Sequence, residues 1–413
     1  MFAEILLQSG VSAIPILIAI ALIIIIGYVA QALFHRTRVP EVLILISIGL
    51  ILVPVGALLP ATYAATLRYL APLFGDLALV TIMYNGGTAI RLTRNDLKNV
   101  SGAYLGVMDN LLPMVVMSVV MYLLFGWPLI YGAILGVILG ETAVAVIIPI
   151  IRRIQMPPAV YSMMVMEVTI NSVVSILLFT VLLSGLTGGV YTFSSAVNYI
   201  VDYISVSLFV GVVAGLAWLA IQHKVKGARE YLPTLAVALL LYGTVSLLNG
   251  AAIISILVFA LMMGNYKEIS SLLRMDIEIS KKEHRESRAV ERDLEFLIRT
   301  FFFVFIGMIA VLSYTYLMYA VVVTVALCVI RYAEVHAITA KEYLDEFGPL
   351  VFSMLPRGTV VAVLAASLYA IGGVYFDQIF YISFMVIILT NVTSALLLRR
   401  AKFKAKPPKP EHI

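Results

Sequence analysis

The residues best suited to chemistry are polar side chains placed inside long apolar segments. Glu167 and Asn171 lie in the middle of the apolar segment 158–184, and Ser172 follows directly. At about 100° per residue, Glu167, Asn171 and Ser175 form one polar stripe on a helix, with Ser172 beside it. Carboxylate, amide and hydroxyl oxygens are ligands for hard cations such as sodium. The stripe therefore predicts either an ion-binding site or a hydrogen-bonded seam between helices.

A second polar position lies in the apolar segment 127–151, where Glu141 and Thr142 follow Gly140. Glycine lowers helix propensity, so we expect the helix to break here. A break frees backbone groups, which are tolerated at membrane depth only where they line a cavity. Glu141 would then either cap these backbone groups or carry a proton or a cation.

A third position is the sequence Pro356-Arg357-Gly358 inside the apolar segment 346–371. Proline removes a helical hydrogen bond and glycine weakens the helix, so this segment is also predicted to break. The sequence therefore predicts two interrupted membrane helices.

Arg357 requires a counter-charge if it lies in the hydrocarbon region. The acidic residues expected at comparable depth are Asp109, Glu141 and Glu167. We predict that Glu167 and Arg357 form a structural ion pair, and that Asp109 and Arg299 are structural partners rather than ligands.

The composition places these segments in a lipid bilayer. Of the 413 residues, 62% are hydrophobic and only 12% are charged, and the mean hydropathy is +1.04. Soluble domains carry roughly 25% charged residues. The chain is therefore predicted to be an all-α integral membrane protein. Its single cysteine, Cys328, excludes an intramolecular disulfide.

The apolar segments predict about thirteen membrane helices, several of them longer than the ~17 residues that a span requires. The second and ninth of these segments are short. The expected spans are residues 11–33, 41–56, 71–91, 100–125, 127–151, 158–184, 196–221, 231–248, 251–264, 294–311, 315–338, 346–371 and 378–399.

Lysine and arginine fall almost entirely on one side of this arrangement. With the N-terminus outside, all but three of the 28 lie in inner loops, at Arg399 or in the basic cytoplasmic tail 400–413 that follows it; the exceptions are Arg68, Arg299 and Arg357. The positive-inside rule predicts this asymmetry for a correctly oriented multi-pass protein of the cell membrane. The net charge of +5 therefore reflects topology and not nucleic-acid binding.

Two of the inner segments carry further expectations. Residues 265–293 mix both charge signs and are predicted to form a solvated or interfacial helix. Residues 331–345 contribute two basic residues to the inner loops, and Glu334 and His336 are placed at the membrane interface.

The two predicted breaks lie seven helices apart, an odd offset that gives them opposite orientations. Interrupted segments at matching places in two halves are typical of inverted repeats around a transport site. We therefore expect one transporter domain, 1–413, with a first repeat at 1–184. A linker helix and the start of the second repeat follow at 185–250, and the rest of the repeat spans 251–399.

The sequence contains no metal-ligand cluster, nucleotide-binding loop or nucleophile triad, so we expect neither an enzyme nor a resident cofactor. Its motifs instead resemble the cation:proton antiporter superfamily, and most closely its NhaP-type sodium/proton antiporters. Residues 356–358 resemble the family's Pro-Arg-Gly segment, and 167–172 resemble its Glu-Ser-x-x-Asn-Asp motif. Further similarity covers 38–54, 86–92 and 301–307.

The resemblance implies a homodimer with the NhaA/NhaP-like fold, in which a six-helix core moves against an interface domain. It also implies that Glu167 pairs with Arg357 and that Asn171 bridges the broken helices. In the family, an aspartate after this asparagine binds sodium or protons, but Ser172 stands in its place. Either Glu141 has taken over the carrier role, or sodium/proton exchange is lost.

We therefore predict a secondary transporter that exchanges a monovalent cation, Na⁺ before K⁺ or Li⁺, for protons. Its ion- and proton-binding residues are predicted to be Glu141, Thr142, Glu167, Asn171 and Ser172, with Glu141 and Ser172 as sodium ligands. The alternatives are a transporter of another solute and a non-transporting membrane sensor or scaffold.

Overall fold

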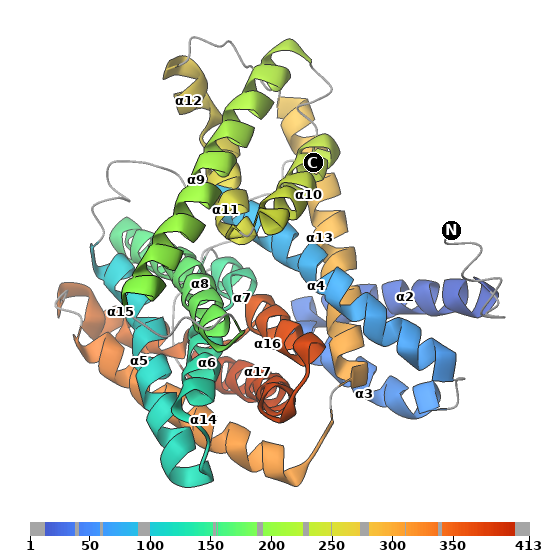
Figure 1. The fold of residues 1–413 in the computed structure, drawn as a ribbon, viewed down its shortest axis with the longest axis vertical. Coiled ribbons are helices and arrows are strands. Elements are labelled where there is room, and N and C mark those ends of the chain that lie inside the picture. The colour runs from blue at the N-terminus through green and yellow to red at the C-terminus, as the bar shows by residue number, and fades with distance from the viewer. Residues whose placement is uncertain are drawn as a thin grey trace.

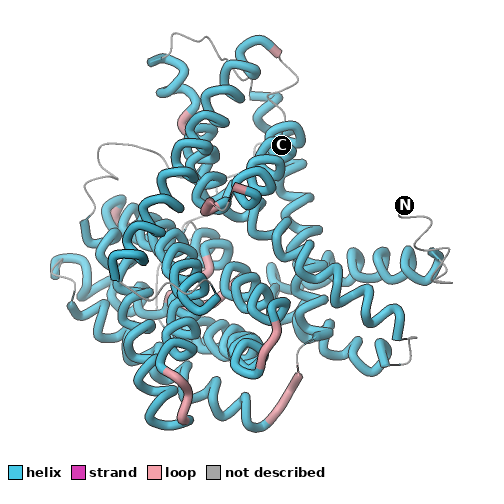
Figure 2. Tube along the Cα trace, viewed as in Figure 1, coloured by secondary structure: helices cyan, strands magenta, loops and turns pink. Residues whose placement is uncertain are grey.

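The structure is a computed structural model in which the regular elements are helices (Figures 1 and 2). It describes residues 13–37, 41–57, 61–89, 100–151, 154, 156–187, 193–225, 231–248, 250–272, 281–309, 311–337 and 341–400. Apart from its first residue, the predicted basic tail lies outside the described residues.

The helices follow one another with short connections. They are α2 (Ala13–Thr37), α3 (Glu41–Ala57), α4 (Ala61–Ala89), α5 (Val100–Phe125), α6 (Leu129–Gly140), α7 (Val144–Ile151), α8 (Pro158–Thr187), α9 (Phe193–Lys224), α10 (Tyr231–Leu247), α11 (Ala252–Gly264), α12 (Tyr266–Leu272), α13 (Lys281–Ile309), α14 (Tyr314–Ala337), α15 (Lys341–Ser353), α16 (Thr359–Ile371) and α17 (Val374–Arg400).

Apart from the two predicted breaks, the predicted apolar segments are helical in the described residues, and two of them differ most at their starts. α4 begins ten residues earlier than predicted, so Arg68 lies within a helix. α13 begins at Lys281, so much of the charged inner segment and the following apolar span form one continuous helix. In the described part of the chain, five helices are long and apolar enough to cross a membrane, and six further apolar helices are shorter. The number of spans stays a prediction.

The helices pack as two groups (Figure 1). The core group consists of α5 to α8 and α14 to α17, and α5 packs closely against α6, α8 and α14. The scaffold group consists of α2 to α4, α9 to α11 and α13, in which α13 packs against α3 and α11 packs against α4 and α9. Helix α4 also contacts α16, so it joins the two groups.

Glycines set the close approach of α5 to its neighbours. Gly132, Gly136 and Gly140 recur every four residues along α6 and lie against the α5 backbone, where a Cβ atom would collide with main-chain atoms. Small residues at this spacing let membrane helices approach closely. The last of them lies against the carbonyl of Asp109, so α5 brings this acidic residue beside the predicted break.

Aromatic residues gather where α6, α14 and α17 approach one another. The Trp127 ring lies 5.5 Å from the ring of Tyr375 and 6.4 Å from that of Tyr319.

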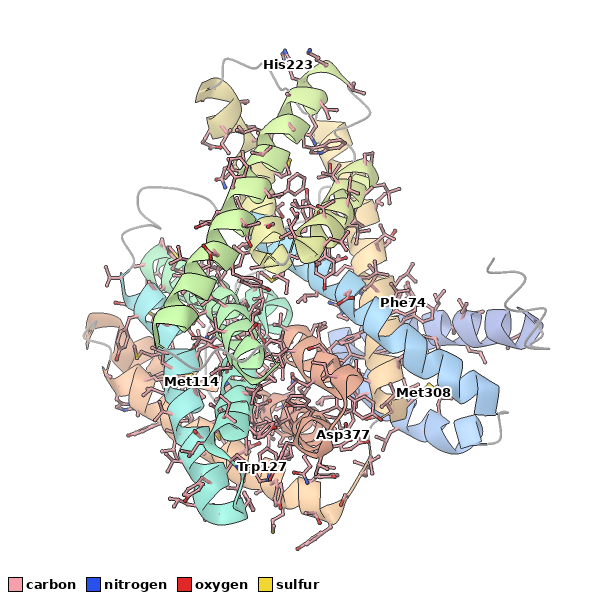
Figure 3. The ribbon with its side chains drawn as sticks, viewed as in Figure 1. Phe74, Met114, Trp127, His223, Met308 and Asp377 are labelled. Atoms are coloured by element: carbon pink, nitrogen blue, oxygen red, sulfur yellow. The ribbon has the colours of Figure 1, made fainter. Side chains whose placement is uncertain are left out.

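Figure 3 shows Trp127 and Asp377 toward one end of the view and His223, near the end of α9, at the other.

Candidate functional site

Both predicted breaks are present, and they meet. The first spans residues 141–143, between α6 and α7, and the second spans 354–358, between α15 and α16. The Ala143 N–H donates to the Pro356 carbonyl at 2.9 Å, so the two interruptions are hydrogen-bonded to each other. A Cβ atom at Gly358 would lie 2.6 Å from that of Ala143, which explains the need for glycine at this crossing.

Asn171, on α8, holds the first break from both sides. Its Nδ2 donates to the Gly140 carbonyl at 3.0 Å, and its Oδ1 accepts from the Thr142 N–H at 2.9 Å. The side chain is fully buried, and the Asn171 carbonyl in turn accepts from Asn110 on α5 at 3.0 Å. The bridging role that the sequence resemblance implied is therefore seen in the geometry.

The second break has a similar clamp, which the sequence analysis missed. Asn391, on α17, donates to the Arg357 carbonyl at 2.8 Å, and the Thr390 hydroxyl accepts from the Arg357 N–H at 3.3 Å. Ser394 donates to the Ser353 carbonyl, at the end of α15, at 2.6 Å. The clustering of these polar residues within an apolar helix was the signal that could have identified them.

Glu141 lies at the first break, with only 1% of the residue exposed. Its Oε1 accepts from the Ser172 hydroxyl at 3.0 Å. Its Oε2 and the Thr142 hydroxyl have no hydrogen-bond partner among the described residues. The structure thus brings the two predicted sodium ligands together and leaves two buried oxygens beside them unsatisfied.

Glu167 does not form the predicted ion pair with Arg357. Its Oε1 lies 2.5 Å from Nη2 of Arg331, whose Nη1 contacts Asp109 at 2.8 Å. Arg331 also donates to the Val351 carbonyl of α15 at 3.0 Å. Because α14 packs against α5, the Arg331 side chain lies between Asp109 and Glu167. The negative charge of Glu167 is therefore balanced by Arg331 and not by Arg357.

Two sequence expectations for α14 were therefore wrong. Arg331, counted among the inner-loop charges, is 2% exposed inside the protein, and Glu334, expected at the interface, is also 2% exposed. Both residues lie near the end of an apolar segment, where a charged side chain is expected to face water, so the sequence did not indicate their burial. His336, two positions after Glu334, is exposed, and its predicted place at the membrane interface stays a prediction.

Arg357 is buried without an ion pair among the described residues. Its backbone is held by α17, but its Nε and Nη1 have no hydrogen-bond partner within that part of the chain. The charges of Asp109 and Glu141 act on the guanidinium from nearby. Arg357 is thus a positive charge close to the carboxylate of the first break, without a direct bond to it.

The sequence left open whether the polar residues of α8 form a hydrogen-bonded seam between helices or face a candidate ion site, and the structure shows contacts of both kinds. Ser175 donates to the Val137 carbonyl of α6 at 3.0 Å, which is a seam between helices. Ser172, on the neighbouring side, faces the carboxylate of the first break.

A family model described as "Sodium/hydrogen exchanger, transmembrane" matches residues 18–399. The chain belongs to the sodium/hydrogen exchanger family. Its members are transporters rather than enzymes, and this exchanger is a multi-pass membrane protein whose function is cation/proton antiport.

Solved structures of a sodium proton antiporter share the exchanger's fold. One structure of MjNhaP1 from Methanocaldococcus jannaschii has a TM-score of 0.74 and 17% identity, and covers 93% of this chain and 97% of that chain. A second MjNhaP1 structure has a TM-score of 0.73 and 19% identity, with coverages of 94% and 97%. These comparisons confirm the predicted NhaP-like helical fold.

Proposed function

We propose that this exchanger moves Na⁺ and protons in opposite directions by alternating access, with Glu141 as the carboxylate that both ions share. The observation that carries the proposal is the state of this side chain. It is buried at a helix break, with one oxygen held by Ser172 and the other unsatisfied. A buried carboxylate of this kind is costly unless a proton or a cation neutralises it.

The neighbouring oxygens support sodium as the cation. Oε2 of Glu141 and the hydroxyls of Thr142 and Ser172 are hard neutral or anionic donors, which alkali cations prefer. Residues 141–143 are not helical, and carbonyls released at such a break can complete a coordination shell, although the Ala143 carbonyl already accepts from the Val146 and Ile147 N–H groups. Since Na⁺ and a proton require the same carboxylate oxygens, the binding of one excludes the other. This competition couples the two fluxes.

The other predicted site residues have supporting roles in this proposal. Glu167 is neutralised by Arg331 and fixes α8 against α14. Asn171 keeps the first break open by satisfying its backbone groups. Both act by holding the site in shape, and the exchangeable charge rests on Glu141.

Arg357 provides the compensating charge when Glu141 has released its ion. Two unit charges close together in a low-dielectric interior attract strongly, so a nearby guanidinium stabilises the empty carboxylate. Because Arg357 makes no direct hydrogen bond to Glu141, it leaves the carboxylate oxygens open to the next ion.

The larger arrangement follows from the sequence predictions. We propose a homodimer in the cell membrane, with the N-terminus outside and the C-terminus in the cytoplasm. Repeats at 1–184 and 251–399, joined through 185–250, would place the two breaks in opposite orientations. Movement of the core group against the scaffold group would then expose Glu141 to alternate sides.

Proteoliposomes with an imposed pH gradient test the carrier assignment. We expect Na⁺ to dissipate the gradient with wild-type protein, and Glu141→Gln to reduce this flux to that of empty liposomes. Asp377→Asn, a half-buried carboxyl group in the first turn of α17, is the matched control and retains the flux. Undiminished flux in Glu141→Gln would show that another group is the carrier. A wild-type protein that moves no monovalent cation would contradict exchange itself.

A further inference from the structure

A buried cluster beside the exchange site contains more acidic than basic groups. Arg331 lies 2.8 Å from Asp109, 2.5 Å from Glu167 and 4.0 Å from Glu334. All four side chains are no more than 3% exposed. One guanidinium therefore faces three carboxyl groups that water does not reach.

Within the described residues, the surrounding elements do not supply the missing positive charge. Helix α15 contributes the neutral Val351 carbonyl to Arg331. The second break contributes Arg357, whose charge acts on Asp109 and Glu334, but Glu141 of the first break draws on the same guanidinium. The two guanidiniums thus serve four carboxyl groups, and full ionisation would leave two negative charges uncompensated.

Unsatisfied oxygens mark where a compensating ion would bind. Oδ2 of Asp109 and Oε1 of Glu334 are buried and have no hydrogen-bond partner among the described residues. The two carboxyl groups converge on one nitrogen, because Nη1 of Arg331 lies 2.8 Å from Oδ1 of Asp109 and 4.0 Å from Oε2 of Glu334. Two ionised carboxylates can only accept hydrogen bonds, so a bond between them requires a proton on one of the two. Like charges sharing a buried site oppose double ionisation for the same reason.

We propose that Asp109 and Glu334 share a resident proton, which forms a second proton-binding site distinct from Glu141. The ligand is a proton rather than a metal cation, because both carboxyl groups lie against the guanidinium of Arg331, whose positive charge repels a second cation. Each carboxyl group is one half of the site: one donates the bound proton and the other accepts it.

The resident proton would balance the charge of the loaded exchanger. With one proton on this pair and one H⁺ or Na⁺ on Glu141, the four carboxyl groups and two guanidiniums are neutral overall in either loaded form. Moving a neutral site avoids the cost of exposing a buried charge to low dielectric. This balance rests on the proposed role of Glu141, whereas the shared proton itself does not.

Infrared spectroscopy of the purified, membrane-reconstituted protein tests the proposal. The carbonyl stretch of protonated carboxyl groups is recorded at about pH 7.5, where an ordinary carboxylate is ionised. A Glu141→Gln background removes any contribution from the carrier. In that background we expect a protonated-carboxyl band that is lost when either Glu334→Gln or Asp109→Asn is added. The combined variant would show no further loss.

Glu295→Gln in the same background is the matched control. Glu295 is a membrane-helix carboxyl group with its own cationic partner, Arg299 at 3.4 Å, so its substitution should leave the band unchanged. A band absent from the Glu141→Gln protein, or one that persists in both Glu334→Gln and Asp109→Asn, would overturn the shared proton. Because Glu334→Gln and Asp109→Asn are tested separately, the experiment still decides if one of the two variants does not fold. The measurement needs no transport, so its outcome is independent of the flux experiment.

Discussion

The hydroxyl of Ser172 donates to Oε1 of Glu141 at 3.0 Å, across the space between α8 and the first helix break. Ser172 occupies the position where the sequence resemblance placed a carboxylate. The structure shows that the carboxylate of the neighbouring break reaches the same place. This contact is the geometry that the proposed carrier role of Glu141 requires.

Removal of the Ser172 hydroxyl is expected to weaken cation binding. Hydrogen bonds to charged groups contribute about 1.5–3 kcal/mol, so Ser172→Ala should raise the KM for Na⁺ about tenfold or more, with a smaller effect on the maximal rate. The measurement is Na⁺-dependent proton flux over a range of Na⁺ concentrations. Ser175→Ala, which breaks a bond to the Val137 carbonyl, is the control and should leave KM unchanged. Equal KM values for wild type and Ser172→Ala would remove Ser172 from the site.

A carboxylate at position 172 is expected to strengthen cation binding. Ser172→Asp would place a second acidic group beside Glu141, and two carboxylates that close together attract a cation or share a proton. We expect a lower KM for Na⁺ and a greater sensitivity of exchange to Li⁺ and Na⁺. Ser172→Asn introduces a side chain of the same size as aspartate but without its charge, so comparison of the two variants separates the effect of charge from that of volume. A higher KM in the aspartate variant than in the asparagine variant would contradict this prediction.

The ion pairs of Arg331 are expected to contribute stability more than exchange. Breaking a buried ion pair by removal of one partner costs about 3–5 kcal/mol, so Glu167→Gln should lower the thermal unfolding temperature clearly. Arg357→Gln removes no ion pair among the described residues, so it should lower the unfolding temperature less while reducing exchange strongly. Thermal unfolding in detergent and flux in proteoliposomes, measured on both variants, check the two roles. The reverse ranking would mean that Arg357 is the structural partner.

Asn391 is expected to hold the second break as Asn171 holds the first. Asn391→Ala removes the donor to the Arg357 carbonyl and leaves that buried carbonyl unsatisfied, at a cost of about 1–3 kcal/mol. Hydrogen exchange should increase in residues 354–358 and not in 141–143. Ser383→Ala is a suitable control, because the buried Ser383 hydroxyl has no hydrogen-bond partner among the described residues. Unchanged exchange in residues 354–358 would show that Asn391 is not needed there.

The helices and their breaks could be predicted because they depend on local features of the sequence. Apolar length predicts helices, and Gly140 and Pro356 oppose helix locally. The partners of charged residues could not be predicted in the same way. Arg331 and Glu167 are 164 positions apart, and their contact depends on how α14 packs against α5. The clamp by Asn391 could be suspected only from the clustering of Thr390, Asn391 and Ser394 in an apolar helix, because none of them carries a charge that demands a partner.

The pH dependence of sodium affinity tests most directly whether both ions share Glu141. Competition for one carboxylate requires that the KM for Na⁺ rise as pH falls, by up to about tenfold per pH unit, while the maximal rate at saturating Na⁺ is unchanged. Glu141→Gln should show no Na⁺-dependent proton flux at any pH between about 5 and 9. A KM for Na⁺ that does not vary with pH in the wild-type exchanger would contradict the shared carboxylate.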